Sequence, residues 1–429
     1  MAKDKLTDYD STASNNLDVG GISVAEGMLP SGVNNAIREQ MSHLADFAAG
    51  TSGVDVLKLQ DDTDTNSIKL QAPASVTTTT TFTLPDGDGA SGQTMITDGA
   101  GTLSWAAPYG NRNLIINGAM QVAQRGTSYS SISSDQYTLD RFIAFHTSVT
   151  PTITQESLSV GQTDLPSRFR NYLRFTAGTG ATLLGFCTRI EDVSKYYGTY
   201  KLSFYAKGTN PAGGSFQQRM IQRFGTGGSS QVITNNGTFT VTSSWQRFEI
   251  DVIVPSVSGK TIGAGSYLQL QFTQPDSDAG TSAWTLDITG IQLEVGSTAT
   301  PFEHRSYGDE LLACMRYYQQ IGGESANVLC TGQCTSSTLA TFFIPFIVPV
   351  RDDPTCSVSD QTHFRVFNAA VSGIPDTTNM TIAANVAASC NGFRILATVG
   401  SGLSAGNATM LYSDDSDNNA GIIKMDAEL

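Results

Sequence analysis

The chain has few cysteines and few charged residues for its length of 429 residues. Six scattered cysteines are too few for the disulfide framework of a small secreted protein. Charged residues make up 15% of the chain, whereas ordinary globular domains hold roughly a quarter. Glycine, serine and threonine are abundant instead. We therefore expect an all-β surface or fibre protein with reduced, partly buried thiols, at Cys187, Cys314, Cys330, Cys334, Cys356 and Cys390.

Long apolar runs are also missing from the sequence. The most apolar stretch, residues 339–350, is about half as long as a bilayer-spanning helix needs to be, and it contains two prolines. The first ten residues, MAKDKLTDYD, lack the apolar core that a signal peptide requires. We expect a soluble protein without membrane insertion, which is made in a cytoplasm and is not exported by a conventional signal.

Positive charge is scarce. The chain has 25 Lys and Arg against 39 Asp and Glu, a formal net charge of −14. Binding to the phosphates of DNA or RNA requires clustered Lys and Arg. The sequence therefore argues against a nucleic-acid partner.

Signatures of catalysis are weak as well. We assign no serine nucleophile, and the sequence has neither an H-E-x-x-H motif nor a P-loop. The four histidines lie far apart in four different segments, so only tertiary contacts could bring one of them into a catalytic triad. We expect no enzyme and no cofactor. The histidines are His43, His146, His304 and His363.

Turn signals dominate the stretch LPDGDGASGQTMITDGAGTLSW, residues 84–105. Its extended runs, Thr94–Thr97 and Leu103–Trp105, are separated by Asp-Gly and Gly-Ala-Gly turns. Strands this small do not bury enough apolar area to offset their own ordering entropy. We expect residues 51–109 to form a β-rich shaft in which copies of the chain intertwine. The threonine run 77–81 leaves a flexible linker open as the other interpretation.

A single amphipathic helix is predicted before this shaft. Apolar residues recur at spacings of four, four and three after Pro30, which marks the helix entry. Two interpretations remain open: the stripe packs on a local domain, or it joins a three-helix bundle about a symmetry axis. The stripe consists of Val33, Ile37, Met41 and Leu44.

Longer strands with period-two alternation follow. In one of them Leu202, Phe204 and Ala206 share a face, and in another Trp284 shares a face with Leu286 and Ile288, which favours core packing for the tryptophan. Such strands at short intervals indicate a β-sandwich over residues 110–306.

A second short helix is predicted after the sandwich. We expect a hinge helix within residues 307–322, with Asp309 as its N-cap, Gly322 as its stop, and an apolar side. Alternation then resumes, as at Cys356–Ser359 and Arg394–Thr398, and predicts a smaller C-terminal β-sandwich over residues 323–429. The expected apolar side consists of Leu311, Leu312, Met315 and Tyr318.

Several of these segments resemble bacteriophage tail fibre proteins. Residues 9–41, YDSTASNNLDVGGISVAEGMLPSGVNNAIREQM, resemble the N-terminal segment of tail fibres from phages of marine bacteria, and residues 84–105 resemble fibre-shaft elements. NGAM (117–120) and QLEVG (292–296) resemble the first and last strands of jelly-roll carbohydrate-binding modules. LLACMRYYQQ (311–320) resembles a hinge that precedes the terminal domains of such fibres.

The resemblance implies a homotrimeric virion protein of the tail. Residues 1–50 would join the fibre to a tail adaptor or nozzle protein, and the two sandwiches would bind a bacterial surface glycan or protein. Adsorption would then be polyvalent binding without covalent chemistry. The alternatives are a purely structural tail or neck component, a secreted carbohydrate-binding protein, and a tailspike-type depolymerase.

Carboxylate pairs keep the depolymerase alternative open, because glycoside hydrolysis needs two acids but no sequence motif. Adjacent Glu191 and Asp192 form one pair, and Asp287 with Glu294 forms another. Against this alternative, the chain lacks the repeated coils of a right-handed β-helix.

Polar residues opposite the apolar strand faces are candidates for glycan binding. If their strands lie side by side in one sheet, they form a polar concave surface with groups that bridge sugar hydroxyls; otherwise they form an ordinary solvated sheet face. The distal domain offers an alternative site, for which we expect His363, Arg365 and Phe393 to be exposed. The glycan-binding candidates are Arg189, Glu191, Tyr205, Arg219, Arg223, Gln269 and Gln271.

Metal binding is left unassigned. Cys330 and Cys334 lack a second pair at zinc spacing. Residues 415–426, DSDNNAGIIKMD, depart from the EF-hand pattern and indicate a solvated turn. The resemblance to jelly-roll modules implies a structural calcium ion, to which Asp287 or Glu294 would contribute, but no residue match establishes it.

Overall fold

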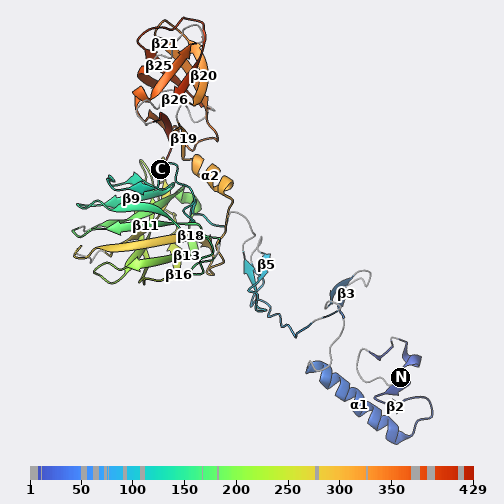
Figure 1. The fold of residues 1–429 in the computed structure, drawn as a ribbon. Helices are drawn as coiled ribbons and strands as arrows, with labels where there is room; N and C mark the ends of the chain where they lie inside the picture. Colours follow the sequence, from blue (N-terminus) through green and yellow to red (C-terminus); the bar gives the residue numbers. More distant parts are fainter. Residues whose placement is uncertain are drawn as a thin grey trace. The chain divides into compact units, whose positions relative to one another are not determined.

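The computed structural model describes residues 8–10, 12–49, 56–60, 67–71, 75, 77–89, 94–106, 112–166, 168–180, 183–275, 280–324, 327–368, 377–383, 392–413 and 420–429. The chain forms two compact units, Met1–Ala106 and Ala107–Leu429 (Figure 1). Strands predominate throughout, as the sequence predicted.

The first unit begins with a small hairpin that is followed by the predicted helix. The hairpin pairs β1 (Asp18–Val19) with β2 (Ile22–Ser23). Helix α1 spans Pro30–Ala48. Proline fits its first turn because the N–H that proline lacks would have no partner within the helix. The predicted helix and its entry at Pro30 are therefore confirmed.

Helix α1 packs through a side that the sequence analysis did not single out. Its buried residues are Ala36 and His43, and the ring Nδ1 of His43 lies 2.8 Å from the hydroxyl oxygen of Tyr9. The predicted apolar stripe lies on another side of α1 and is exposed, so it does not pack on a local domain within the described residues. Its members are 43–63% exposed: Val33, Ile37, Met41 and Leu44.

Two small antiparallel hairpins complete the first unit. Strand β3 (Val56–Gln60) pairs with β4 (Ser67–Gln71), and β5 (Thr94–Thr97) pairs with β6 (Leu103–Ala106). The extended runs predicted at 94–97 and 103–105 are thereby confirmed. The indole N–H of Trp105 donates to the carbonyl of Gly87 at 2.7 Å, which ties the turn-rich segment to this hairpin.

The second unit contains a large β-sandwich of two six-stranded antiparallel sheets. The first sheet has the order β16-β13-β18-β11-β10-β7 and the second has the order β15-β14-β17-β12-β9-β8. The four-strand sets 11-18-13-16 and 12-17-14-15 give the jelly-roll strand order, since the chain crosses between sheets at nearly every step. The predicted jelly roll is confirmed.

The strand bounds of the large sandwich are as follows. The first sheet consists of β7 (Ser128–Tyr129), β10 (Thr152–Ser157), β11 (Asn171–Ala177), β13 (Gly198–Thr209), β16 (Gln246–Val254) and β18 (Trp284–Val295). The second sheet consists of β8 (Gln136–Tyr137), β9 (Phe142–His146), β12 (Leu184–Glu191), β14 (Phe216–Arg223), β15 (Val232–Phe239) and β17 (Tyr267–Thr273).

The core of this sandwich follows the period-two pattern of its strands. Alternate residues of β13 and of β18, including Phe204 and Trp284, are buried between the sheets. Trp284 stacks on Phe175, with ring centroids 5.1 Å apart. The core assignment of Trp284 is therefore confirmed.

A smaller β structure forms the C-terminal part of the second unit. One sheet has the order β19-β27-β22 and another has the order β23-β26-β20-β21-β25-β24. They share a core that includes Phe342, Ile395, Leu411 and Ile423. The strands are β19 (Tyr318–Gly322), β20 (Val328–Cys334), β21 (Leu339–Pro345), β22 (Thr355–Val358), β23 (Phe364–Asn368), β24 (Thr377–Ala383), β25 (Gly392–Val399), β26 (Ala408–Ser413) and β27 (Ile422–Asp426).

Helix α2 is shorter than predicted and starts from a different cap. It spans Tyr307–Met315, and its N-cap is Ser306, whose hydroxyl accepts from the N–H of Asp309. The predicted N-cap at Asp309 and the helix stop at Gly322 are wrong, because β19 begins at Tyr318 and pairs with β27. The buried residues of α2 are Glu310 and Cys314, neither of which belongs to the apolar side that the sequence predicted. The Glu310 carboxylate accepts from the N–H of Asn117, which holds this side inward.

Two further expectations are settled within the described residues. No helix there is long and apolar enough to cross a membrane. Five cysteines are free thiols, as expected, whereas Cys390 lies outside the described residues.

Candidate functional site

Six of the seven candidate glycan-binding residues lie on one sheet. They come from β12, β17 and β14, which are neighbours in the second sheet. Arg189 on β12 is directly opposite Gln269 on β17, and Gln271 is directly opposite Arg219 on β14. The outward side chains of three adjacent strands thus form one polar row, which we call the outer polar row. It consists of Arg189, Glu191, Arg219, Arg223, Gln269 and Gln271.

Tyr205 does not belong to this row. It lies on β13 in the first sheet, and its ring packs edge-on against Phe169 at 5.4 Å. The alternation within one strand predicts which side chains share a face, but it does not predict which sheet the strand joins.

The outer polar row is shielded from solvent although it faces away from the core. Gln269 is 6% exposed and Gln271 is 5% exposed. The side-chain amide of Gln269 donates to the amide oxygen of Gln271 at 3.4 Å. Long polar side chains therefore cover one another along β17, so this is not an ordinary solvated sheet face.

Some of these shielded polar atoms have no protein partner. They are the Nε atoms of Arg189 and Arg223 and the Oε1 atom of Gln269. A buried polar atom without a hydrogen bond costs on the order of 1–3 kcal/mol. These three atoms are enclosed by the protein, so the hydrogen-bonding groups of the row are incompletely satisfied within the chain.

A cavity of about 600 Å³ opens at one end of the row. Arg223 and Tyr267 line it on the sheet side. The remaining lining comes from two loops and is rich in hydroxyl and amide groups. The sequence analysis did not single out Tyr267 or these loops as candidates. The loops are rich in glycine and serine, which form no hydrophobic periodicity from which a site could be predicted. The loop residues are Phe224, Gly225, Thr226, Ser229, Ser230, Gln231, Ala264 and Gly265.

The other end of the row contacts the C-terminal part of the second unit. The Glu191 carboxylate accepts hydrogen bonds from Nε and Nη2 of Arg316, at 3.0 and 2.7 Å. Arg189 donates through Nη1 to the carbonyl of Leu429, and its guanidinium lies 4.8 Å from the ring centroid of Tyr267. Glu191 and Arg189 therefore have internal contacts, whereas Arg223 lies at the open end.

The carboxylate pairs considered for hydrolysis are occupied by internal partners. Asp287 receives two hydrogen bonds from Arg174, at 2.7 and 2.8 Å. Asp192 accepts from the N–H of Ser194 and lies 3.2 Å from Lys195. Within the described ranges, neither pair presents two carboxylates that are both unpaired.

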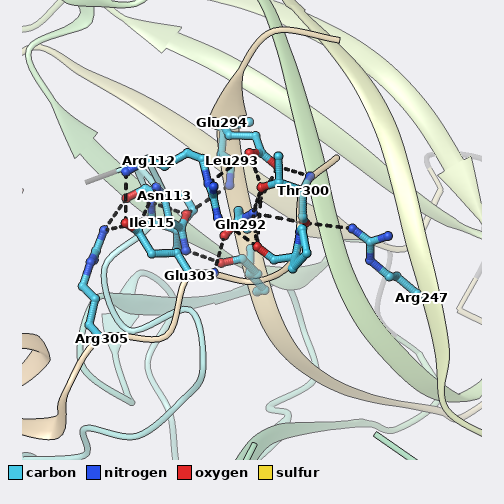
Figure 2. A network of polar contacts seen from close by, with 12 residues as sticks. Arg112, Asn113, Ile115, Arg247, Gln292, Leu293, Glu294, Thr300, Glu303 and Arg305 are labelled. Carbon is cyan, nitrogen blue, oxygen red and sulfur yellow. Dashed lines mark hydrogen bonds and ion pairs between the residues drawn. The ribbon is translucent and has the colours of Figure 1, made fainter. Parts of the chain in front are cut away.

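Glu294 belongs to a buried polar network (Figure 2). This network joins the segment where the chain enters the large sandwich to the segment where the chain leaves it. The Glu294 carboxylate accepts from the N–H and the hydroxyl of Thr300, at 2.9 and 2.7 Å, and lies 3.4 Å from Nε of Arg112. Its oxygens are thus used for closure of the fold. No group of three His, Cys, Asp or Glu suited to a metal ion is found among the described residues.

The distal candidates are not gathered into one exposed site. Phe393 is 1% exposed and stacks on Phe346 within the core, so its expected exposure is wrong. His363 and Arg365 are half-buried. Asp415, Asp417 and Asn419 of the calcium-like segment lie outside the described residues, whereas Asp426 pairs with Arg125.

One motif was overlooked in the sequence. Residues 402–406, GLSAG, fit the G-x-S-x-G spacing of a serine nucleophile, although no serine nucleophile was assigned from the sequence. That motif works at a sharp turn from a strand into a helix. Here Ser404 lies between strands β25 and β26. The structural context therefore does not match a nucleophile elbow.

No family model matches the chain, and no curated protein matches it. The family 11 carbohydrate-binding module of a Clostridium thermocellum cellulase is 14% identical, with 41% of this chain and 97% of that chain covered and a TM-score of 0.24. The enzymatically active domain of tailspike protein 4 of bacteriophage CBA120 is 15% identical, with 43% and 21% covered and a TM-score of 0.27. A cyclase from Fischerella sp. TAU is 13% identical, with 44% and 96% covered and a TM-score of 0.28. These weak neighbours differ in function and carry no functional argument.

Proposed function

We propose that this protein is a phage tail fibre that adsorbs the virion to a host cell by binding a surface glycan through the open end of the outer polar row. The observation that carries the proposal is the cavity itself, which Arg223, Tyr267 and two loops rich in hydroxyl and amide groups line. The proposed role is binding without covalent chemistry.

A glycan fits this arrangement because its hydroxyl groups both donate and accept hydrogen bonds. The guanidinium of Arg223 is a donor, and the hydroxyl groups of Thr226 and Ser229 both donate and accept, so a hydroxylated ligand finds partners of both kinds in the cavity lining. Tyr267 lines the same cavity and supplies an aromatic ring for a sugar to pack against. A few polar groups that converge in a pocket are typical of small-ligand sites.

The fibre assembly is proposed from the first unit. The apolar stripe of α1 is exposed in one chain. Burial of residues such as Ile37 and Met41 between copies removes apolar surface from water and therefore stabilises the assembly. The isolated two-stranded hairpins that follow are marginal by themselves. We infer a homotrimer whose three α1 helices pack together, and a tail adaptor or nozzle protein that receives residues 1–50.

The test of the binding function uses the full chain and immobilised bacterial O-antigens and capsular polysaccharides. We expect at least one polysaccharide to bind, and its binding to weaken by about tenfold in Arg223→Ala. The matched control is Lys201→Ala, since Lys201 lies on the first sheet and pairs with Asp251 at 2.8 Å. Failure to bind any polysaccharide, or equal losses in the control, would overturn the proposal.

The same incubation addresses the depolymerase alternative. A binding protein leaves the size distribution of the polysaccharide unchanged, as measured by size-exclusion chromatography. Shortening of the polymer by the purified chain would contradict a purely binding role.

A further inference from the structure

The cavity at the end of the outer polar row is surrounded by positive charge in an acidic protein. Arg223 lines the cavity. Arg189 lies over the ring of Tyr267 at 4.8 Å, and Lys260 lies 5.9 Å from the ring of Phe224. Tyr267 and Phe224 are themselves lining residues. Three cations from three segments therefore approach one cavity, although the whole chain has a net charge of −14.

Acidic residues are absent from the loops that form this cavity. The segments 224–231 and 255–266, all described, contain no Asp or Glu, and Lys260 is their only charged residue. On the strand side, Glu191 is already paired with Arg316. Asp192 is paired with Lys195 at 3.2 Å. The charge of Asp135 also acts on Arg189.

Arg223 has no carboxylate partner among the described residues. Arg223 makes neither an ion pair nor a hydrogen bond there, and its shielded Nε is unpartnered. Arg189 donates to a carbonyl and leaves its own Nε unpartnered. A guanidinium group holds a planar fork of donors that matches a carboxylate, and such charge-assisted hydrogen bonds are about twice as strong as neutral ones. The missing partner is therefore best supplied as an anion.

We propose that the ligand of this cavity is an acidic polysaccharide, whose sugar carboxylates bind beside Arg223 while neighbouring hydroxyls bind the serine-rich loop. This inference rests on the proposed glycan-binding function and specifies its substrate class. A sugar acid combines the two chemistries that the cavity offers, namely cationic donors on one side and hydroxyl-rich loops on the other.

The test compares matched polysaccharides on the full chain. The probes are uronic acid-containing bacterial capsular polysaccharides, each beside its carboxyl-reduced form, together with neutral O-antigens. Reduction replaces the carboxylate by a hydroxymethyl group and leaves the linkages in place. We expect binding to an acidic member to weaken by about tenfold or more after reduction, which corresponds to the loss of one charge-assisted contact.

Variants locate the effect in the cavity. Arg223→Gln should weaken binding to the acidic member by about tenfold and leave binding to its reduced form nearly unchanged. Lys260→Gln, in an exposed loop, should give a smaller loss that disappears at high salt. Lys201→Gln on the other sheet is the charge-matched control. Because Lys260 is exposed, its variant keeps the inference testable if Arg223→Gln destabilises the fold.

The outcomes separate the two proposals. Equal binding to a polysaccharide and its reduced form, or a preference for neutral members, would overturn the acidic class and leave glycan binding in place. Loss of binding in Lys201→Gln as large as in Arg223→Gln would overturn the location. No binding to any member of the panel would overturn both the substrate class and the proposed function.

Discussion

At the residue scale, the clearest departure from sequence pattern is Arg141. Its side chain is 1% exposed, and its guanidinium lies 3.4 Å from the ring centroid of Tyr317. It pairs with Glu428 and also donates to the carbonyl of Arg189. A buried arginine is stable only where such partners surround it. No local sequence motif predicts the burial of Arg141, because its partner Glu428 lies 287 residues away in the chain.

Replacement of Arg141 by methionine should destabilise the second unit by about 3 kcal/mol, because Glu428 then loses one buried partner while Arg125 remains 3.3 Å away. The free energy of unfolding in urea measures the change. The control is Lys195→Met, since the exposed pair of Lys195 with Asp192 is worth less than about 1 kcal/mol. A loss no larger than that of the control would contradict the role assigned to Arg141.

His304 provides a pH-dependent prediction. It lies 4.9 Å from the rings of both Phe169 and Phe302, and this burial, together with the charge of Arg168, lowers the pKa of His304. As the pH falls below about 6.5, the unfolded chain takes up the proton first. The contribution of His304 to stability is therefore complete above that pH and is lost as the pH falls through the lowered pKa.

The variant His304→Phe, which keeps an aromatic ring at this position, should reduce the fall in melting temperature between about pH 7.5 and pH 5. Differential scanning calorimetry at the two pH values measures this difference. An unchanged fall in the variant would show that other groups produce the pH dependence.

At the element scale, helix α1 has one side that packs within the chain and another side that is apolar but exposed. Ala36 and His43 face the N-terminal segment, whereas Ile37 and Met41 belong to the exposed stripe about a quarter turn away. The apolar stripe therefore does not stabilise the single chain. Its burial requires another surface, for which we propose the same stripe in two further copies.

Ile37→Asp should convert the full chain from a trimer to smaller species, because a carboxylate within an apolar seam is costly to bury. Multi-angle light scattering measures the solution mass. The control is Asn35→Asp, which adds the same charge at an exposed position on the side of α1 away from the stripe. A full chain that is monomeric before any substitution would contradict the trimer, and a trimer that persists in Ile37→Asp would place its seam elsewhere.

At the scale of the second unit, the C-terminal segment joins the two β structures. Arg125 pairs with Asp426 and Glu428, at 3.2 and 3.3 Å, and stacks on the ring of Tyr318 at 3.6 Å. Arg351 donates to the carbonyls of residues 427 and 428, at 2.9 and 3.0 Å. These contacts predict that the large sandwich and the smaller β structure unfold together.

Arg125→Ala should separate this unfolding into two transitions, with the smaller β structure melting first because its core is the smaller one. Calorimetry of the full chain with limited proteolysis during heating tests this, and Lys195→Ala is the control. A single transition in Arg125→Ala would show that the remaining contacts couple the two structures without Arg125.

The sequence by itself determined the elements whose signals are local. Each of these signals lies within a few residues, so it could be predicted without tertiary information. The elements are α1 with its stripe and proline entry, the small hairpin near residue 100, and the alternating strands β13, β17 and β18. The jelly-roll strand order was predicted from resemblance, and the strand pairing confirms it.

Only the tertiary structure decided what these elements contact. It placed Tyr205 in the other sheet, buried Phe393, ended α2 at Met315 and brought Arg189 and Arg223 to either side of Tyr267. Each of these results depends on pairing between strands that are tens of residues apart. Alternation determines which side chains share a face of one strand, but the partner of that strand and the layer that covers it depend on the packing of the whole sandwich.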